Sequence, residues 1–138
     1  MTPATWGQRL GAFLIDELFI FIVTFCAVYA LRLNGQFGAA VLTWLLAGAY
    51  FAVLNGSDMG QTFGKRALGI QVRDAGDAGG PIGVGRAAVR YVTVGLFVIV
   101  PFFIIFTVLD GLWPLWDRRY QALHDKIGGS VVVQVSQS

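Results

Sequence analysis

The chain has 138 residues, of which 56% are hydrophobic and 13% are charged. Soluble domains contain about 25% charged residues, so this composition indicates a membrane protein of one domain, too short for two globular units. The net charge of +2, without a basic patch interleaved with aromatic residues, argues against nucleic-acid binding. The single cysteine, Cys26, cannot form an internal disulfide and has no Cys or His companion at metal-ligand spacing.

The first apolar segment, predicted as a helix over residues 8–31, contains two acidic residues, Asp16 and Glu17. An ionisable group in lipid costs about 2.5–3.5 kcal/mol, so we expect these groups to face other helices and to have partners. Arg9 precedes Asp16 by close to two helical turns, which places both on one face, roughly 10 Å apart. The acidic pair and the lack of a convincing cleavage site favour a retained membrane helix over a cleaved signal peptide.

The second apolar segment, residues 38–54, is free of charge. It follows the first after the short loop 32–36, so the two helices are expected to be antiparallel neighbours. Gly48, Ala52 and Gly56 recur at every fourth residue, which predicts a stripe where another backbone approaches closely.

A polar, glycine-rich loop, residues 55–85, follows the second helix. Within it, Ile70–Arg73 alternates like a strand, and Val131–Gln134 near the C-terminus has the same character. Both runs favour extended structure through β-branched residues, and neither is stable alone. We therefore predict that they pair as a short β-ribbon at the cytoplasmic surface.

The last apolar stretch is too long for one untilted span of about 20 residues. Pro101 divides it into two short segments, residues 86–100 and 102–117. Two segments return the chain to the side from which it entered, either as short spans or as a re-entrant pair. The alternative is a chain of three spans with an external tail.

Basic residues decide between these arrangements. Arg32 is the only basic residue of the first interhelical loop, whereas the region after the second helix and the tail, residues 118–138, contain many. The positive-inside rule therefore places both termini and the central loop in the cytoplasm. The expected fold is an all-α membrane protein, a bundle of four apolar helical segments with a small cytoplasmic β-ribbon.

Three polar clusters lie around these segments: Arg9–Asp16, Gly60–Arg66 and Arg118–Val133. In this order, they resemble the RDD family of small bacterial membrane proteins, which is named for one arginine and two aspartates. The resemblance extends over nearly the whole chain and departs from the family pattern at Ser130, where the pattern usually has threonine. It implies that the three naming residues are Arg9, Asp16 and Asp125.

We expect Arg9, Asp16 and Asp125 to converge near the inner membrane face, where Arg9 would neutralise one of the two carboxylates. This requires the tail to fold back under the first helix. The supporting candidates are Glu17, Gln61, Thr62, Lys65, Arg66 and His124. His124 would either pass protons near neutral pH or form ordinary hydrogen bonds.

The Gly60 cluster is not a phosphate-binding P-loop. That motif needs four residues between its glycines and a Ser or Thr after the Lys, whereas three residues separate Gly60 from Gly64 and Arg66 follows Lys65. The basic pair would either anchor this turn at anionic lipid head groups or close the inner end of a polar cavity.

Two functions fit these features. The resemblance implies transport of a small ion or solute, in which a buried Asp16 would exchange a proton for a cation. The alternative is a membrane scaffold or accessory subunit whose polar cluster serves assembly. An enzyme is not expected, because no nucleophile–base pair appears in the sequence, and no cofactor or metal is predicted. The expected setting is a bacterial inner membrane, with the lipid bilayer and either a second copy or another membrane protein as partner.

Overall fold

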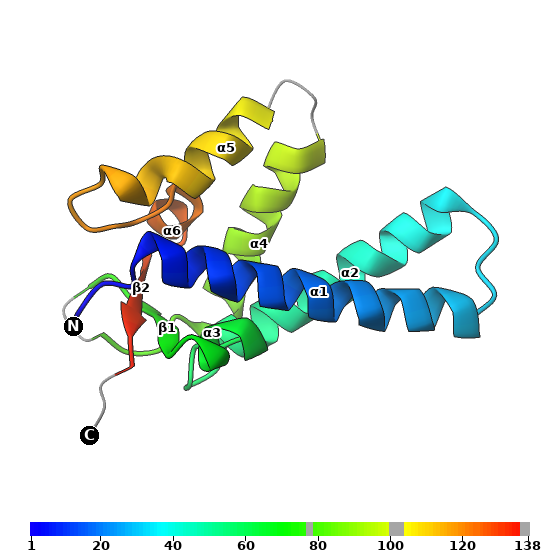
Figure 1. Cartoon of the computed structure of the whole chain (residues 1–138), viewed down its shortest axis with the longest axis horizontal. Helices are drawn as coiled ribbons and strands as arrows, with labels where there is room; N and C mark the ends of the chain where they lie inside the picture. Colours follow the sequence, from blue (N-terminus) through cyan, green and yellow to red (C-terminus); the bar gives the residue numbers. More distant parts are fainter. Residues whose placement is uncertain (77–78, 100–103, 136–138) are drawn as a thin grey trace.

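The computed structural model describes residues 1–76, 79–99 and 104–135. These residues form a mostly helical structure with one two-stranded sheet, as Figure 1 shows. The elements in chain order are α1 (Trp6–Ala30), α2 (Gln36–Gly56), α3 (Phe63–Ala67), β1 (Ile70–Asp74), α4 (Gly83–Ile99), α5 (Ile104–Leu112), the 3₁₀ turn η2 (Trp113–Leu115), α6 (Leu123–Ile127) and β2 (Ser130–Gln134).

Helix α1 begins at a capping box. The Thr5 hydroxyl accepts the backbone N–H of Gln8, and the Gln8 side chain accepts the backbone N–H of Thr5 at 3.0 Å. This reciprocal pair satisfies two amides that the first helical turn leaves free. The helix ends at Ala30, shortly before Arg32, whose φ of 51° turns the chain toward α2.

Helices α1 and α2 form the long hairpin that extends to the right in Figure 1. Each is long and apolar enough to cross a bilayer, yet only 22% and 11% of their most apolar stretches are buried within the protein. Large apolar side chains therefore cover the outside of the hairpin, among them Phe21 and Phe25 of α1. A core helix of a soluble protein would be mostly buried, so these surfaces favour contact with lipid.

The small-residue stripe of α2 packs against α4, as its spacing predicts. A Cβ atom at Gly56 would lie 2.5 Å from the Val84 backbone, and one at Gly48 would lie 2.9 Å from the Tyr91 ring. Ala52, between them, is buried. The close approach of α4 at this stripe positions the start of α4 beside the C-terminal end of α2.

Helices α4 and α5 form the second, shorter pair of apolar helices, seen at the top of Figure 1. Their 17 and 9 residues correspond to the segments expected at 86–100 and 102–117, with both ends shifted. Pro101, where the division is expected, lies outside the described residues. Over their described residues, neither helix reaches the roughly 20 residues that an untilted span requires.

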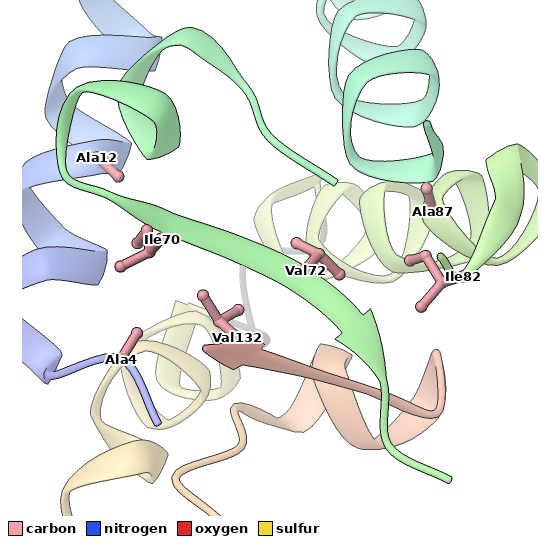
Figure 2. Packing of buried hydrophobic residues seen from close by; sticks show 7 residues of the cluster. All are labelled: Ala4, Ala12, Ile70, Val72, Ile82, Ala87 and Val132. Atoms are coloured by element: carbon pink, nitrogen blue, oxygen red, sulfur yellow. The ribbon is translucent and has the colours of Figure 1, made fainter. Parts of the chain in front are cut away.

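The predicted β-ribbon is confirmed. Strands β1 and β2 are antiparallel, with Ile70 opposite Gln134 and Arg73 opposite Val131. Figure 2 shows Val72 and Val132 at the centre of the ribbon, within an apolar core that α1, α4 and the N-terminal segment complete. The core residues are Ala4, Ala12, Ile70, Val72, Ile82, Ala87 and Val132.

The described parts of the loop 55–85 and of the tail 118–138 contain more regular structure than the sequence suggests. Each contains a five-residue helix, α3 or α6, shortly before its strand. Helices this short leave no periodic pattern to recognise. They bring the polar motifs of the loop and the tail against the inner ends of the membrane helices, where the candidate site lies.

Candidate functional site

The first half of the site is built around Asp16, whose side chain is 1% exposed although it lies within a long apolar helix. Its Oδ1 accepts hydrogen bonds from the Tyr50 hydroxyl at 2.6 Å and from the Gly64 backbone N–H at 2.8 Å. Its Oδ2 accepts one from the Thr62 hydroxyl at 2.5 Å. None of the ion pairs that the described residues form includes Asp16. The carboxylate is therefore held by neutral donors.

The Gly60–Arg66 cluster supplies two of these three donors. Thr62 is the N-cap of α3, and its hydroxyl accepts the Lys65 amide while donating to Asp16. Gly64 allows α3 to lie directly on α1, because a Cβ there would overlap the Ala12 carbonyl oxygen. The cluster thus acts as a clamp on α1 that requires a hydroxyl and a glycine at these two positions.

Aromatic rings enclose the Asp16 contacts from the side of α2. The Phe19 ring packs edge-on against Phe63 at 4.9 Å between centroids, and Tyr50 lies 5.2 Å from Phe19 and 5.7 Å from Phe63. The Tyr50 hydroxyl also accepts the Phe63 backbone N–H at 3.0 Å. These rings exclude water from one side of the carboxylate, which strengthens each hydrogen bond to it.

The second half of the site is built around Asp125, which is fully buried at the start of α6. Its Oδ2 accepts from Arg9 at 2.7 Å and from the Ala122 backbone N–H at 3.1 Å, and its Oδ1 pairs with Arg90. Burial alone would raise the pKa of Asp125, but the charges of Arg90, His124 and Arg9 hold it well below its usual value. This carboxylate stays ionised.

Asp110 of α5 and His124 form a third contact beside Asp125. Asp110 accepts the His124 backbone N–H at 2.8 Å and lies 2.6 Å from its Nδ1, while Nε2 faces Asp125 at 3.3 Å. The imidazole therefore bridges two buried carboxylates. Arg90 lies over Gly128, where a Cβ would overlap its stem, and its Nε and Nη1 are buried without a partner among the described residues.

Lys65 connects the two carboxylate sites electrostatically. It is partly buried on α3, where it experiences the charges of Asp16 and Asp125 as well as those of Arg90 and Arg9. Burial, followed by the repulsion of Arg90, lowers the pKa of Lys65 to about 8. An amine with this pKa changes charge near physiological pH. It lies between a carboxylate held by neutral donors, Asp16, and one held by cations, Asp125.

The family model for the RDD family matches residues 3–129. The chain belongs to the RDD family. None of the curated proteins and none of the solved structures matches it. Family membership and the two long apolar helices together support a membrane protein.

The structure divides the three residues that the resemblance to the RDD family singles out, Arg9, Asp16 and Asp125. Arg9 and Asp125 meet directly, because the tail folds back under α1 as expected. Asp16 is not part of this ion pair and has its own set of donors. The expected single cluster is therefore two adjoining sites, and the carboxylate that Arg9 neutralises is Asp125.

The supporting candidates also separate into two groups. Thr62, Lys65 and His124 lie at the sites, as described above. Gln61 instead donates to the Ile70 carbonyl at 2.9 Å and stabilises the turn between α3 and β1. Glu17 and Arg66 are exposed, and neither forms part of the two sites.

Three site residues escape the sequence analysis. Tyr50 is an aromatic residue in an apolar helix and reads as lipid-facing, and Arg90 reads as one more cytoplasmic charge. Asp110 has the clearest signal, because an acidic residue within an apolar stretch requires a partner just as Asp16 does. Within the described residues, no group of three His, Cys, Asp or Glu side chains is arranged to hold a metal ion.

Proposed function

We propose that this RDD-family protein is a multi-pass protein of the bacterial inner membrane that transports a small ion or solute by cation/proton exchange at Asp16. Both termini lie in the cytoplasm in this proposal, and the protein acts as a homo-oligomer or with another membrane protein. Its role is binding and exchange, without covalent chemistry and without a cofactor.

The observation that supports this proposal most strongly is the set of neutral donors around Asp16. A carboxylate that were present only for structure would be expected to have a cationic partner at this depth, as Asp125 has. With hydroxyl and amide donors alone, Asp16 can lose its charge without leaving a buried cation unpaired. Exchange at Asp16 therefore breaks no ion pair among the described residues, whereas exchange at Asp125 would break those with Arg9 and Arg90.

The same donors suit a small cation. The Tyr50 and Thr62 hydroxyls both rotate, so each can turn its lone pairs toward an ion bound at Asp16. Carboxylate and hydroxyl oxygens are the ligands that small hard cations prefer. Binding of a cation would displace the proton from the carboxyl group, and return of the proton would release the cation.

The proposed orientation rests on charge and on the position of the short helices. Lys65 and Arg66 lie on α3 and Lys126 lies on α6, and the positive-inside rule assigns this basic region to the cytoplasm. Reporter fusions after Arg32 and after Ser138 should give opposite answers. The same answer from both fusions would contradict this orientation.

Ion flux in proteoliposomes tests the transport function. A pH-sensitive dye inside vesicles should record proton release when a cation gradient is applied to the native protein, and Asp16→Asn should abolish this signal while the protein stays folded. Glu17→Gln is the matched control, because it removes the neighbouring, exposed carboxylate of the same helix. Flux that persists in Asp16→Asn, or is absent from the native protein, would reject the proposal.

A scaffold function is the second candidate, and Asp125 favours it. Arg9 of α1, Arg90 of α4 and the start of α6 all meet at this one carboxylate, which ties the beginning and the end of the chain together. Such a fully paired site specifies assembly. In the scaffold case, the native protein shows no flux, and Asp125 variants lose the partner protein or the oligomer instead.

A further inference from the structure

The two α–β units of the protein have the same local geometry. We define the first unit as Gly60–Asp74, which contains α3 and β1, and the second as Tyr120–Gln134, which contains α6 and β2. In each, a five-residue helix is followed by a short turn with a glycine and then by a five-residue strand. The shift along the chain that superimposes Gly60 on Tyr120 also superimposes both ends of each helix and strand.

Backbone conformation follows the same shift. Gly60 and Tyr120, which open the units, have φ of 60° and 53°, and Gly69 and Gly129, which precede the strands, have φ of 63° and 58°. Left-handed backbone is uncommon, above all for a bulky residue such as Tyr120. Left-handed backbone at two matched positions of each unit indicates that the two units share one backbone structure.

Side-chain hydrogen bonds follow it as well. Gln61 donates to the Ile70 carbonyl at 2.9 Å, and Gln121 donates to the Ser130 carbonyl at 2.8 Å. Donor and acceptor are both displaced by the same shift. Each glutamine closes its unit by joining the segment before the helix to the first residue of the strand.

The ribbon relates the two units by an approximate two-fold axis. Val72 pairs with Val132, its own counterpart, and the pairs on either side exchange positions symmetrically, from Ile70 with Gln134 to Asp74 with Ser130. Figure 2 shows Val72 and Val132 facing the same core at the middle of the ribbon. The axis passes between these two valines.

One contact between each unit and the helix before it corresponds too. Tyr50 of α2 and Asp110 of α5 are related by the same shift, and each accepts a backbone N–H from the first turn of the short helix that follows. The matched amides of Gly64 and His124 both donate to a buried aspartate of an apolar helix, Asp16 in one case and Asp110 in the other.

We propose that the protein consists of two halves of one design, α1–α2–α3–β1 and α4–α5–α6–β2. In the second half, the contact of Asp110 with His124 takes the place of the contacts that Tyr50 and Asp16 make with α3 in the first. Asp110 is a positioning residue that holds α6 on α5. This inference rests on the orientation proposed above, in which both halves enter and leave the membrane on the same side. The axis would then run along the membrane normal, as in transporters built from parallel repeats. Figure 1 shows the two hairpins leaving a common base of ribbon and short helices.

The division into halves gives the Arg9–Asp125 pair a specific place. Arg9 belongs to the first half and Asp125 to the second, so this ion pair joins the halves at their cytoplasmic end. Asp16, in contrast, is held entirely within its own half, by Tyr50, Thr62 and Gly64. Asp16 therefore fixes the inside of one half, and Asp125 fixes one half against the other.

A circular permutant tests whether the halves are equivalent units. The N-terminal segment lies against the last strand, since the Gln134 N–H donates to the Thr2 carbonyl at 2.9 Å, so a short glycine linker can join Ser138 to Met1. Opening the chain between Gly79 and Gly80 then exchanges the order of the halves. We expect this permutant to be recovered folded, with a thermal midpoint close to the native one.

The matched control is opened between Asn34 and Gly35, within the first hairpin, with the same linker. We expect this control not to be recovered folded, because its new ends would lie on the side of the membrane opposite to the cytoplasm. If the chain instead crosses the membrane three times, the half-exchanged permutant would insert in the opposite orientation. That permutant would then be lost as well. Equal recovery or equal loss of the two permutants would overturn the proposal.

Hydrogen exchange tests the second polar contact independently of any transport. Asp110→Ala should raise amide exchange in α6 by about tenfold, which corresponds to the loss of one hydrogen bond to a charged group, and leave α3 unchanged. Tyr50→Phe should do the converse. Asp110→Asn, which retains an acceptor for the His124 amide, should restore protection of α6. If α6 exchange is unchanged in Asp110→Ala, or if both helices loosen together in either variant, Asp110 does not have this role.

Discussion

Asp16 and Asp125 are the same residue type and are both almost completely buried, yet the protein holds them in opposite ways. Asp16 lies within an apolar helix and accepts only from hydroxyl and amide groups, whereas Asp125 lies at the start of a short helix between two guanidinium groups. Burial therefore does not decide what a carboxylate does. The partners decide it, because a loss of charge at Asp125 would leave two guanidinium groups unpaired, whereas no ion pair of the described residues depends on Asp16.

The largest effect is expected from Asp125→Asn. This variant removes the charge between Arg9 and Arg90 and leaves two buried cations without a full partner, so the free energy of unfolding should fall by about 3–5 kcal/mol. Denaturant unfolding in detergent micelles measures it. Asp117→Asn, which breaks the more exposed pair with Lys126, should cost less than about 1 kcal/mol. Equal costs would show that the pairing of Asp125 with Arg9 and Arg90 contributes no more to stability than an exposed ion pair.

The second effect is expected from Tyr50→Phe. The variant removes one donor to Asp16 and the acceptor of the Phe63 amide, so it should cost about 1.5–3 kcal/mol. Tyr91→Phe is the control, since the Tyr91 hydroxyl donates to a neutral carbonyl, that of Trp44, a bond worth about 0.5–1.5 kcal/mol. The comparison between the two sites weakens if Tyr50→Phe costs no more than Tyr91→Phe.

The third effect concerns the close approach of α3 to α1. Gly64→Ala would place a methyl group against the Ala12 carbonyl and the Asp16 carboxyl carbon, so α3 must move outward at a cost of about 1–3 kcal/mol. Gly7→Ala is the control, because a Cβ at Gly7 meets nothing within 4 Å. Thermal unfolding of both variants separates the contact from the general effect of replacing a glycine. A neutral Gly64→Ala would mean that the clamp is loose.

The smallest effect is a pH dependence from Lys65. The folded protein releases the Lys65 proton near pH 8, whereas the unfolded chain keeps it to near the ordinary value of 10.5. The unfolded state binds more protons in this window, so the free energy of unfolding contributed by Lys65 rises with pH between about 8 and 10.5 and is constant below it. Lys65→Met should flatten this slope and raise the thermal midpoint at pH 7. A slope that survives the substitution belongs to another group.

The sequence predicts the ribbon well and the partners of Asp16 poorly, for one physical reason. The ribbon is encoded locally, in two β-branched runs whose alternation fixes their register. The partners of Asp16 come from Tyr50, Thr62 and Gly64, which are far from it along the chain, and a hydroxyl or a backbone amide leaves no charge pattern to follow. Charge patterns do predict that Arg9 needs a carboxylate, but they do not say which one.

The two halves escape sequence analysis for a similar reason. When Gly60 is aligned with Tyr120, the α–β units share only the identical pairs Gln61 with Gln121, Gly69 with Gly129 and Val72 with Val132. These positions fix a turn, a left-handed backbone and the centre of the ribbon. The remaining positions need only suit a short helix or a strand, which many residue types do.

The contact of the N-terminal segment with β2 imposes an order on folding during synthesis. Ala4 donates to the Val132 carbonyl, and Pro3 pairs with Val133, so residues 3 and 4 bind a strand that is synthesised well over 100 residues after them. The clamp on Asp16 can form once Gly64 has emerged, whereas Arg9 must wait for Asp125. A nascent chain therefore passes through a stage in which its first hairpin is complete and its layer of ribbon and short helices is still open. An incomplete chain would expose the unpaired edge of β1, and this edge distinguishes it from the complete protein.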